Sequence, residues 1–351
     1  MGFTPRPLEA GGHVKVLDPL RGIAALAVVL FHYTGSVLPT VRPNPLEGPF
    51  EIGRYGVHVF FVISGFVIPY ALHRSGHRLK DLGRFLLRRY IRIAPPAYIA
   101  ALAVILFHAL AVAVTGHLNA DAEWPGVNGR SVIGNLLFMP SFFGTYWFNF
   151  PYWTLMIEFQ FYLVIGLMLP WLIDPERRWS VPILLIAFML PGFLDDRYLF
   201  NYSPLFTMGI LVFLHLNGTI GRRLFIPMLL VTAVLTYLFL DSHGLVIGTL
   251  TSLLILSRMN IQGRVLDHLG KISYSLYIIH VPVAYYAESV LKRIVPIHDG
   301  PAGRLIMIFV YTFLALLAAS IFHRWLETPF MQLSKRLFRS PSVKAAAGTL
   351  K

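Results

Sequence analysis

Residues 16–38 read VLDPLRGIAALAVVLFHYTGSVL, and this stretch decides the fold. It is apolar over most of its length, yet it contains Arg21 and His32. A helix needs about 20 apolar residues to cross about 30 Å of hydrocarbon. The stretch therefore predicts a membrane-spanning helix that carries two ionisable side chains.

Apolar runs of similar length recur along the rest of the chain. Of all residues 56% are hydrophobic and 13% are charged, whereas a soluble domain has about 25% charged residues. We therefore predict an all-α, polytopic integral membrane helical bundle of about ten transmembrane helices. The predicted spans are 16–38, 56–73, 95–115, 152–173, 179–195, 199–216, 223–240, 243–258, 272–291 and 304–326.

One further apolar piece, 131–145, is short and contains Pro140 and Gly144. We interpret it as a re-entrant or interfacial segment, and the number of spans becomes eleven if it crosses. The predicted domains are a cytoplasmic N-terminal segment (1–15), a membrane domain (16–330) and a basic cytoplasmic tail (331–351).

The positive charge is distributed unevenly between the loops. With ten spans and a cytoplasmic N-terminus, 23 of the 30 Lys and Arg residues lie on the cytoplasmic side and 7 on the other. This asymmetry follows the positive-inside rule and places both termini in the cytoplasm. The net charge of +13 is also compatible with nucleic-acid binding, but the short basic loops favour contact with membrane lipid and no nucleic acid.

Arg21 and His32 are eleven residues apart, which is close to three helical turns. Both should therefore lie on one helix face, about 16 Å apart along the axis. A snorkelling arginine and a hydrogen-bonded histidine would explain them structurally. Ionisable groups inside a membrane are costly, however, and histidine is the side chain best suited to general base catalysis near neutral pH.

A second cationic group precedes the third predicted span. Arg88, Arg89 and Arg92 have helical spacing, and Pro95 follows them. Arginine binds phosphate through two parallel hydrogen bonds, so this group is a candidate anion site. Positive-inside anchoring is the alternative interpretation.

Two further polar positions fall within predicted spans. Glu158 is the one carboxylate that we place away from the ends of a span, and Tyr162 shares its helix face. A buried carboxylate must be paired or protonated, so His32 or a buried arginine is its expected partner. His280 shares a face with Ser273 and Tyr277. They line a cavity in one interpretation and join helices by polar contacts in the other.

Several kinds of chemistry are excluded by the sequence. The chain contains no cysteine, which excludes disulfides, cysteine metal sites and a thioester acyl-enzyme. It also contains no phosphate-binding loop, dinucleotide fingerprint, serine-hydrolase elbow or zinc-protease motif. We predict no metal site.

Taken in order, these groups resemble the acyltransferase-3 family of membrane acyltransferases, from about residue 16 to residue 330. Pro19 stands where many relatives have Gly. The segments that carry the resemblance are Leu17–Gly22 with His32, Phe60–Phe66, Arg89–Pro95, Trp153–Tyr162 and Ser273–His280.

The resemblance implies transfer of an acyl group, most often acetyl, from cytoplasmic acyl-CoA to a hydroxyl group. The acceptor would be a sugar-containing molecule such as an exopolysaccharide or O-antigen, and the protein would lie in a bacterial cytoplasmic (inner) membrane. The residues implied are His32 as general base with Arg21 and Glu158 in catalysis, Arg88, Arg89 and Arg92 for the acyl donor, and Ser64, Tyr162, Tyr274 and His280 in the substrate cavity.

Within this interpretation, Arg21 either holds the pantetheine arm of the donor or polarises its thioester carbonyl, and Glu158 orients His32. An acyl-histidine intermediate is an alternative route. A different class of function, a proton-coupled transporter or flippase, would also use buried Arg, His and Glu residues. A relative that binds acyl groups without catalysis is the third alternative.

Overall fold

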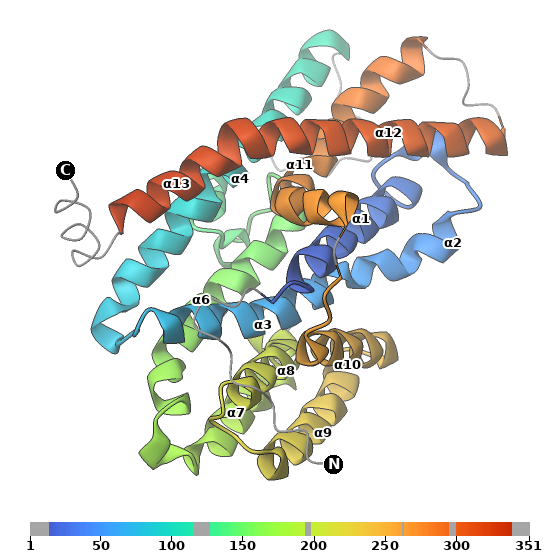
Figure 1. Ribbon diagram of the computed structural model, residues 1–351. Coiled ribbons are helices and arrows are strands. Elements are labelled where there is room, and N and C mark those ends of the chain that lie inside the picture. The colour runs from blue at the N-terminus through green and yellow to red at the C-terminus, as the bar shows by residue number, and fades with distance from the viewer. Residues whose placement is uncertain (1–13, 116–126, 194–197, 262, 295–299, 339–351) are drawn as a thin grey trace, which may run out of the picture.

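The computed structural model describes residues 14–115, 127–193, 198–261, 263–294 and 300–338. Within these ranges the chain is helical and contains no strand. In hydrocarbon every backbone N–H and C=O must be satisfied within the protein, and a helix does so inside one segment. The apolar runs therefore fold into helices, as Figure 1 shows.

The helices are of very different lengths. The α-helices are α1 Leu17–Thr34, α2 Glu47–Phe50, α3 Gly56–Arg74, α4 Leu82–Thr115, α5 Gly129–Leu136, α6 Trp153–Leu172, α7 Ser180–Met189, α8 Leu199–Leu216, α9 Arg222–Phe239, α10 Ser242–Ser257, α11 Arg264–Ile294, α12 Pro301–Phe322 and α13 Thr328–Leu337. Short 3-10 turns occur at η1 Pro39–Val41, η2 Glu51–Tyr55, η3 Leu79–Asp81, η4 Pro140–Phe143, η5 Phe150–Tyr152, η6 Pro175–Arg177 and η7 Leu190–Phe193, and η8 His323–Glu327 is a π-helix.

Each predicted span corresponds to a helix, but their ability to cross a membrane differs. In the described part of the chain, six helices are long and apolar enough to do so. The helical stretches Ser180–Gly192 and Ser242–Ser257 are apolar but shorter. The all-helical membrane fold is therefore confirmed, and the count of about ten spans stays a prediction.

The segment 131–145 forms the eight-residue helix α5 and the 3-10 turn η4. Gly144 closes this turn with a φ of 61°, a left-handed conformation that glycine adopts without a steric penalty. A helix of eight residues is about 12 Å long, well short of the hydrocarbon thickness.

Close helix contacts at glycine hold the centre of the bundle together. A Cβ added at Gly22 of α1 would lie 2.7 Å from the backbone of Gly270 in α11. A Cβ at Gly65 of α3 would lie 2.1 Å from the carbonyl oxygen of Phe206 in α8. Small residues allow membrane helices to approach this closely. The contact between α1 and α11 also places Arg21 near Ser273.

The C-terminal helices α12 and α13 are continuous through η8 and run across the top of Figure 1. The Ser334 hydroxyl donates a hydrogen bond to the carbonyl oxygen of Arg88 at 2.8 Å, which ties α13 to α4. The predicted boundary at residue 330 falls inside α13. Most of the predicted tail, residues 339–351, lies outside the described residues, as do residues 1–13 of the N-terminal segment.

Candidate active site

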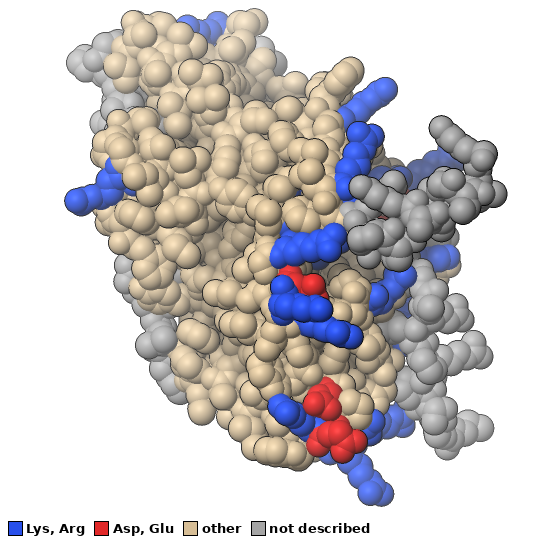
Figure 2. Space-filling view, turned by 90° about the vertical axis from the view of Figure 1, so that its left-hand side faces the viewer, with Lys and Arg blue, Asp and Glu red and all other residues tan. Residues whose placement is uncertain are grey.

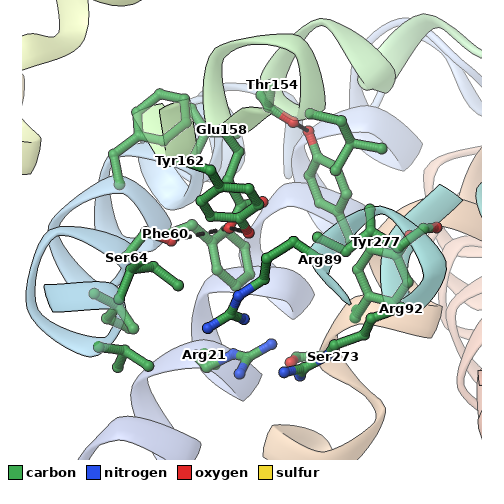
Figure 3. A pocket seen from close by; sticks show the side chains of 18 residues that line it. Arg21, Phe60, Ser64, Arg89, Arg92, Thr154, Glu158, Tyr162, Ser273 and Tyr277 are labelled. Carbon is green, nitrogen blue, oxygen red and sulfur yellow. Dashed lines mark hydrogen bonds between the residues drawn. The ribbon is translucent and has the colours of Figure 1, made fainter. Parts of the chain in front are cut away.

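Helices α1, α3, α4, α6 and α11 surround a cavity with about 940 Å³ of space, its open mouth included. Apolar side chains of α3 and α6 form much of its wall. Figure 3 shows the polar side chains that face it. They are Arg21, Ser64, Arg89, Arg92, Thr154, Glu158, Tyr162, Ser273, Tyr274 and Tyr277.

Three guanidinium groups gather on one side of this cavity (Figure 3). Arg21 comes from α1, and Arg89 and Arg92 come from one face of α4. Among the described residues, none of the three forms an ion pair with a carboxylate. The guanidinium of Arg89 instead lies over the Tyr162 ring, 5.5 Å from its centroid. The buried Nε of Arg21 has no hydrogen-bond partner. Partly buried cations without an ion-paired carboxylate favour an anionic ligand.

Glu158 lies across the cavity from these arginines (Figure 3). Its Oε1 accepts hydrogen bonds from the Ser64 hydroxyl at 3.1 Å and from the Tyr162 hydroxyl at 2.5 Å. The second bond spans one helical turn, so Glu158 and Tyr162 share the face that the sequence predicts. Two hydroxyl donors fix the carboxylate at the wall of the cavity.

Tyrosine hydroxyls fix the wall that α11 contributes. Tyr277 shares a 2.8 Å hydrogen bond with the hydroxyl of Thr154 and donates to the carbonyl oxygen of Pro151 at 2.9 Å. Tyr274 donates to the carbonyl oxygen of Ile93 at 2.6 Å. These bonds join α11 to α4 and to the start of α6, the same helices that carry Arg89, Arg92 and Glu158.

His32 lies outside the lining of this cavity, beside His280. Their rings are stacked with centroids 5.2 Å apart, and the edge of Phe150 covers His32. The Nδ1 of His280 is 2.7 Å from the carbonyl oxygen of Tyr277. Because a carbonyl only accepts, Nδ1 carries the proton and Nε2 bears a free lone pair. That Nε2 and the Nδ1 of His32 are buried without a hydrogen-bond partner.

The structure therefore separates the predicted site into two neighbouring groups. Arg21, Glu158 and the cavity-lining residues are together, whereas His32 and His280 form the second group. Tyr277 links them, since it lines the cavity and its ring lies 6.1 Å from that of His280. Glu158 and His32, which the sequence interpretation paired, are not brought into contact.

Arg88 faces a different space on the same side of α4. It lines a more open pocket together with Arg89 and Arg92, and this pocket also contacts Arg74 of α3 and Lys335 of α13. Arg89 and Arg92 thus line both the cavity and this more open pocket.

Glu327 is a buried carboxylate that the sequence interpretation did not include. It lies in η8, just past the predicted span 304–326, and is 4% exposed. Its Oε2 accepts a hydrogen bond from the Ser275 hydroxyl at 2.6 Å and lies 2.8 Å from the Nδ1 of His323. The prediction of one intramembrane carboxylate, Glu158, is therefore incomplete. The spacing of His323 and Glu327, one turn apart at the end of an apolar run, is a signal in the sequence.

The chain has sequence relatives among acetyltransferases. A family model described as an acyltransferase domain matches residues 14–324. Peptidoglycan O-acetyltransferase OatA of Listeria monocytogenes is 26% identical over 184 residues, which are 49% of this chain and 27% of OatA. Nodulation protein 10 of Rhizobium leguminosarum bv. viciae is 28% identical over 195 residues, which are 50% of this chain and 48% of that protein.

A third relative matches over more of its length. ORF330 of Acidianus two-tailed virus, an acetyltransferase by its given name, is 26% identical over 316 residues, covering 80% of this chain and 87% of ORF330. The chain thus spans less than half of the two cellular relatives and most of the viral one. No solved structure matches it.

Groups of His, Asp and Glu able to hold a metal ion are absent among the described residues.

The family match covers the helices that build the cavity and carry Arg21, His32, Glu158 and His280. This chain therefore belongs to the family whose model is described as an acyltransferase domain.

Proposed function

We propose that the protein transfers an acyl group from acyl-CoA to a hydroxyl of a sugar-containing acceptor, and we expect this group to be acetyl. The observation that carries this proposal is the gathering of Arg21, Arg89 and Arg92 at one cavity without ion-paired carboxylates. A donor that carries several phosphates and a polarisable thioester suits such a site.

The geometry favours one of the two roles considered for Arg21. Arg21 and His32 are eleven residues apart on α1, about 16 Å along the axis. Arg21 lines the cavity whereas His32 lies outside its lining, which favours separate roles for the two side chains. We assign Arg21 to the pantetheine arm of the donor, with the thioester reaching past Tyr277 to the histidine pair. Glu158, bonded to Ser64 and Tyr162, then offsets part of the arginine charge.

His32 acts as the general base in this proposal. As the acceptor oxygen attacks the thioester carbonyl, its proton passes to His32. The tetrahedral intermediate collapses, the carbon–sulfur bond breaks, and the CoA thiolate takes the proton from the imidazolium. His280 lies beside this step with a free Nε2 lone pair that can orient the acceptor hydroxyl.

The acceptor is proposed from the relatives. The name of OatA states that it acetylates peptidoglycan, a polysaccharide. We propose that a cell-surface glycan is the acceptor here too, and that the protein lies in the bacterial cytoplasmic membrane with the donor entering from the cytoplasm.

The test measures transfer of label from radiolabelled acetyl-CoA to glycan acceptors in membranes containing wild type, His32→Ala or His215→Ala. We expect His32→Ala to lose at least about 100-fold in turnover, since general base catalysis contributes on the order of 10²–10⁴. Binding of CoA should persist in this variant.

His215 is the matched control, because it is buried like His32 but lies at the end of α8 and bonds to the carbonyl oxygen of Ile220 just after that helix. His215→Ala should keep its turnover. Wild-type turnover in folded His32→Ala would show that His32 is not the base. If wild type moved no label to any glycan but hydrolysed the thioester, the acceptor class would be wrong and the donor right.

A further inference from the structure

Two more open pockets between α3, α4 and α13 adjoin the cavity. The first shares Val67, Arg89 and Arg92 with the cavity. The second shares Arg88 and Lys335 with the first. The shared lining residues place the three spaces next to one another. We call the two outer pockets the basic mouth.

Cations from three separate helices line the basic mouth. They are Arg74 of α3, Arg84 and Arg88 of α4, and Lys335 of α13. Asp81 is the one carboxylate among the described lining residues, and it accepts a hydrogen bond from the backbone N–H of Arg78 at 3.1 Å. Figure 2 shows Lys and Arg side chains gathered along one side of a face with few charges elsewhere.

Specific contacts hold α13 against the basic mouth. Ser334 is 2% exposed, and its hydroxyl bonds to the carbonyl oxygen of Arg88 at 2.8 Å. Arg84 donates from Nη2 to the carbonyl oxygen of Phe338 at 3.1 Å. Lys335 follows the buried Ser334 directly and lines both outer pockets. Among the described residues Lys335 and Arg88 form no ion pair.

Helix α13 begins at Thr328, beyond the matched residues 14–324, so the family match assigns it no role. We propose that Lys335, with Arg74 and Arg88, binds the phosphate groups at the nucleotide end of the acyl donor. This inference rests on the proposed function, because it takes acyl-CoA as the donor. It makes α13 one wall of the donor site.

The cations and the adjoining cavity both support a nucleotide end at the basic mouth. Several separate cations around one open pocket suit a ligand with several phosphates, which Arg binds with paired hydrogen bonds and Lys as a point charge. The uncharged pantetheine arm of the same ligand can then extend from Arg89 and Arg92 into the cavity. An anionic lipid headgroup offers similar phosphate chemistry, but its acyl chains belong in the membrane and not in a cavity lined by arginine.

The experiment measures binding of CoA and of phosphate-free pantetheine to purified protein in discs of neutral lipid. Wild type, Lys335→Glu and the control Arg336→Glu are compared. Arg336 is the adjacent exposed cation on α13, and it does not line the basic mouth. We expect the Kd for CoA to rise about tenfold or more in Lys335→Glu alone, with the Kd for pantetheine unchanged.

Three other outcomes would contradict either the inference or the proposed donor. Equal CoA affinity in Lys335→Glu and Arg336→Glu overturns the inference. If Lys335→Glu loses added phosphatidylglycerol but keeps CoA, the basic mouth holds a lipid headgroup and the inference is wrong. If wild type itself does not bind CoA, the donor in the proposed function is what fails. Equal melting temperatures of the three proteins show that the charge changes leave the fold intact.

Discussion

At the scale of the single residue, Glu327 shows what a buried carboxylate contributes to this bundle. Its Oε2 takes a hydrogen bond from Ser275 of α11 and contacts His323 one turn earlier. Glu327→Ala would leave both groups without their partner in the interior. We expect the free energy of unfolding to fall by roughly 2–4 kcal/mol, measured as a lower melting temperature in detergent.

Glu176 provides the control, because its side chain is exposed in the 3-10 turn η6. Glu176→Ala should change the melting temperature little, since surface substitutions stay within about 0.5 kcal/mol. Equal melting temperatures for the two variants would show that Glu327 does not stabilise the contact between η8 and α11.

Residue types in the site could be predicted from the sequence, and their partners could not. Arg21 and Glu158 are conspicuous because ionised groups are rare in apolar runs, and Arg89 because it belongs to a cationic group before the third span. The structure places all three at one cavity. The partner of His32 depends on how far α11 is shifted along α1. That shift is set by the close contact of Gly22 and Gly270, which no pattern within one helix reveals.

At the scale of the element, the packing of α3 against α8 gives the sharpest prediction. A Cβ at Gly209 of α8 would lie 2.1 Å from the carbonyl oxygen of Val62 in α3. Gly209→Ala must push these helices apart, and overpacking of this kind costs about 1–3 kcal/mol. We expect a lower melting temperature and, because α3 carries Ser64, weaker CoA binding.

Gly83→Ala is the matched control, because a Cβ at Gly83 of α4 would meet no atom within 4 Å. Alanine is the better helix former, so stability should hold or rise slightly. If Gly209→Ala were as stable as Gly83→Ala, the close approach of α3 and α8 would be wrong.

The existence of the helices could be predicted, but several of their ends could not. The third span was predicted to begin at Pro95, where a proline commonly opens a helix. In the structure α4 begins at Leu82 and continues through Pro95 and Pro96. Neighbouring groups can satisfy the backbone that proline frees in a membrane helix. Helix α11 is likewise longer than predicted, at Arg264–Ile294, because its polar first turns carry no apolar signal.

At the scale of the whole molecule, charge and helix order together predict which side each loop faces. The uneven distribution of Lys and Arg puts the loop before α9 with the basic mouth on the cytoplasmic side, and α2 on the other side. This assignment depends on ten crossings. In the described part of the chain, six helices are long and apolar enough to cross a membrane. The side of the membrane on which each loop lies therefore has to be measured.

The cysteine-free chain makes this measurement direct. Gly48 in α2 and Gly221 before α9 are both exposed, and a Cβ at either would meet no atom within 4 Å. Single Gly48→Cys and Gly221→Cys variants should therefore fold normally. In intact spheroplasts, a membrane-impermeant maleimide should label Gly48→Cys, whereas Gly221→Cys should react only after lysis.

Labelling of both variants in intact spheroplasts would mean that the number of crossings between them is even, and one short helix such as α7 would then lie within the membrane without crossing it. The reverse pattern, with Gly221→Cys alone labelled, would place the basic mouth outside the cell, away from the cytoplasmic pool of acyl-CoA. The expected pattern puts the basic mouth on the side where the proposed donor is made, and it leaves the opposite face to the proposed acceptor.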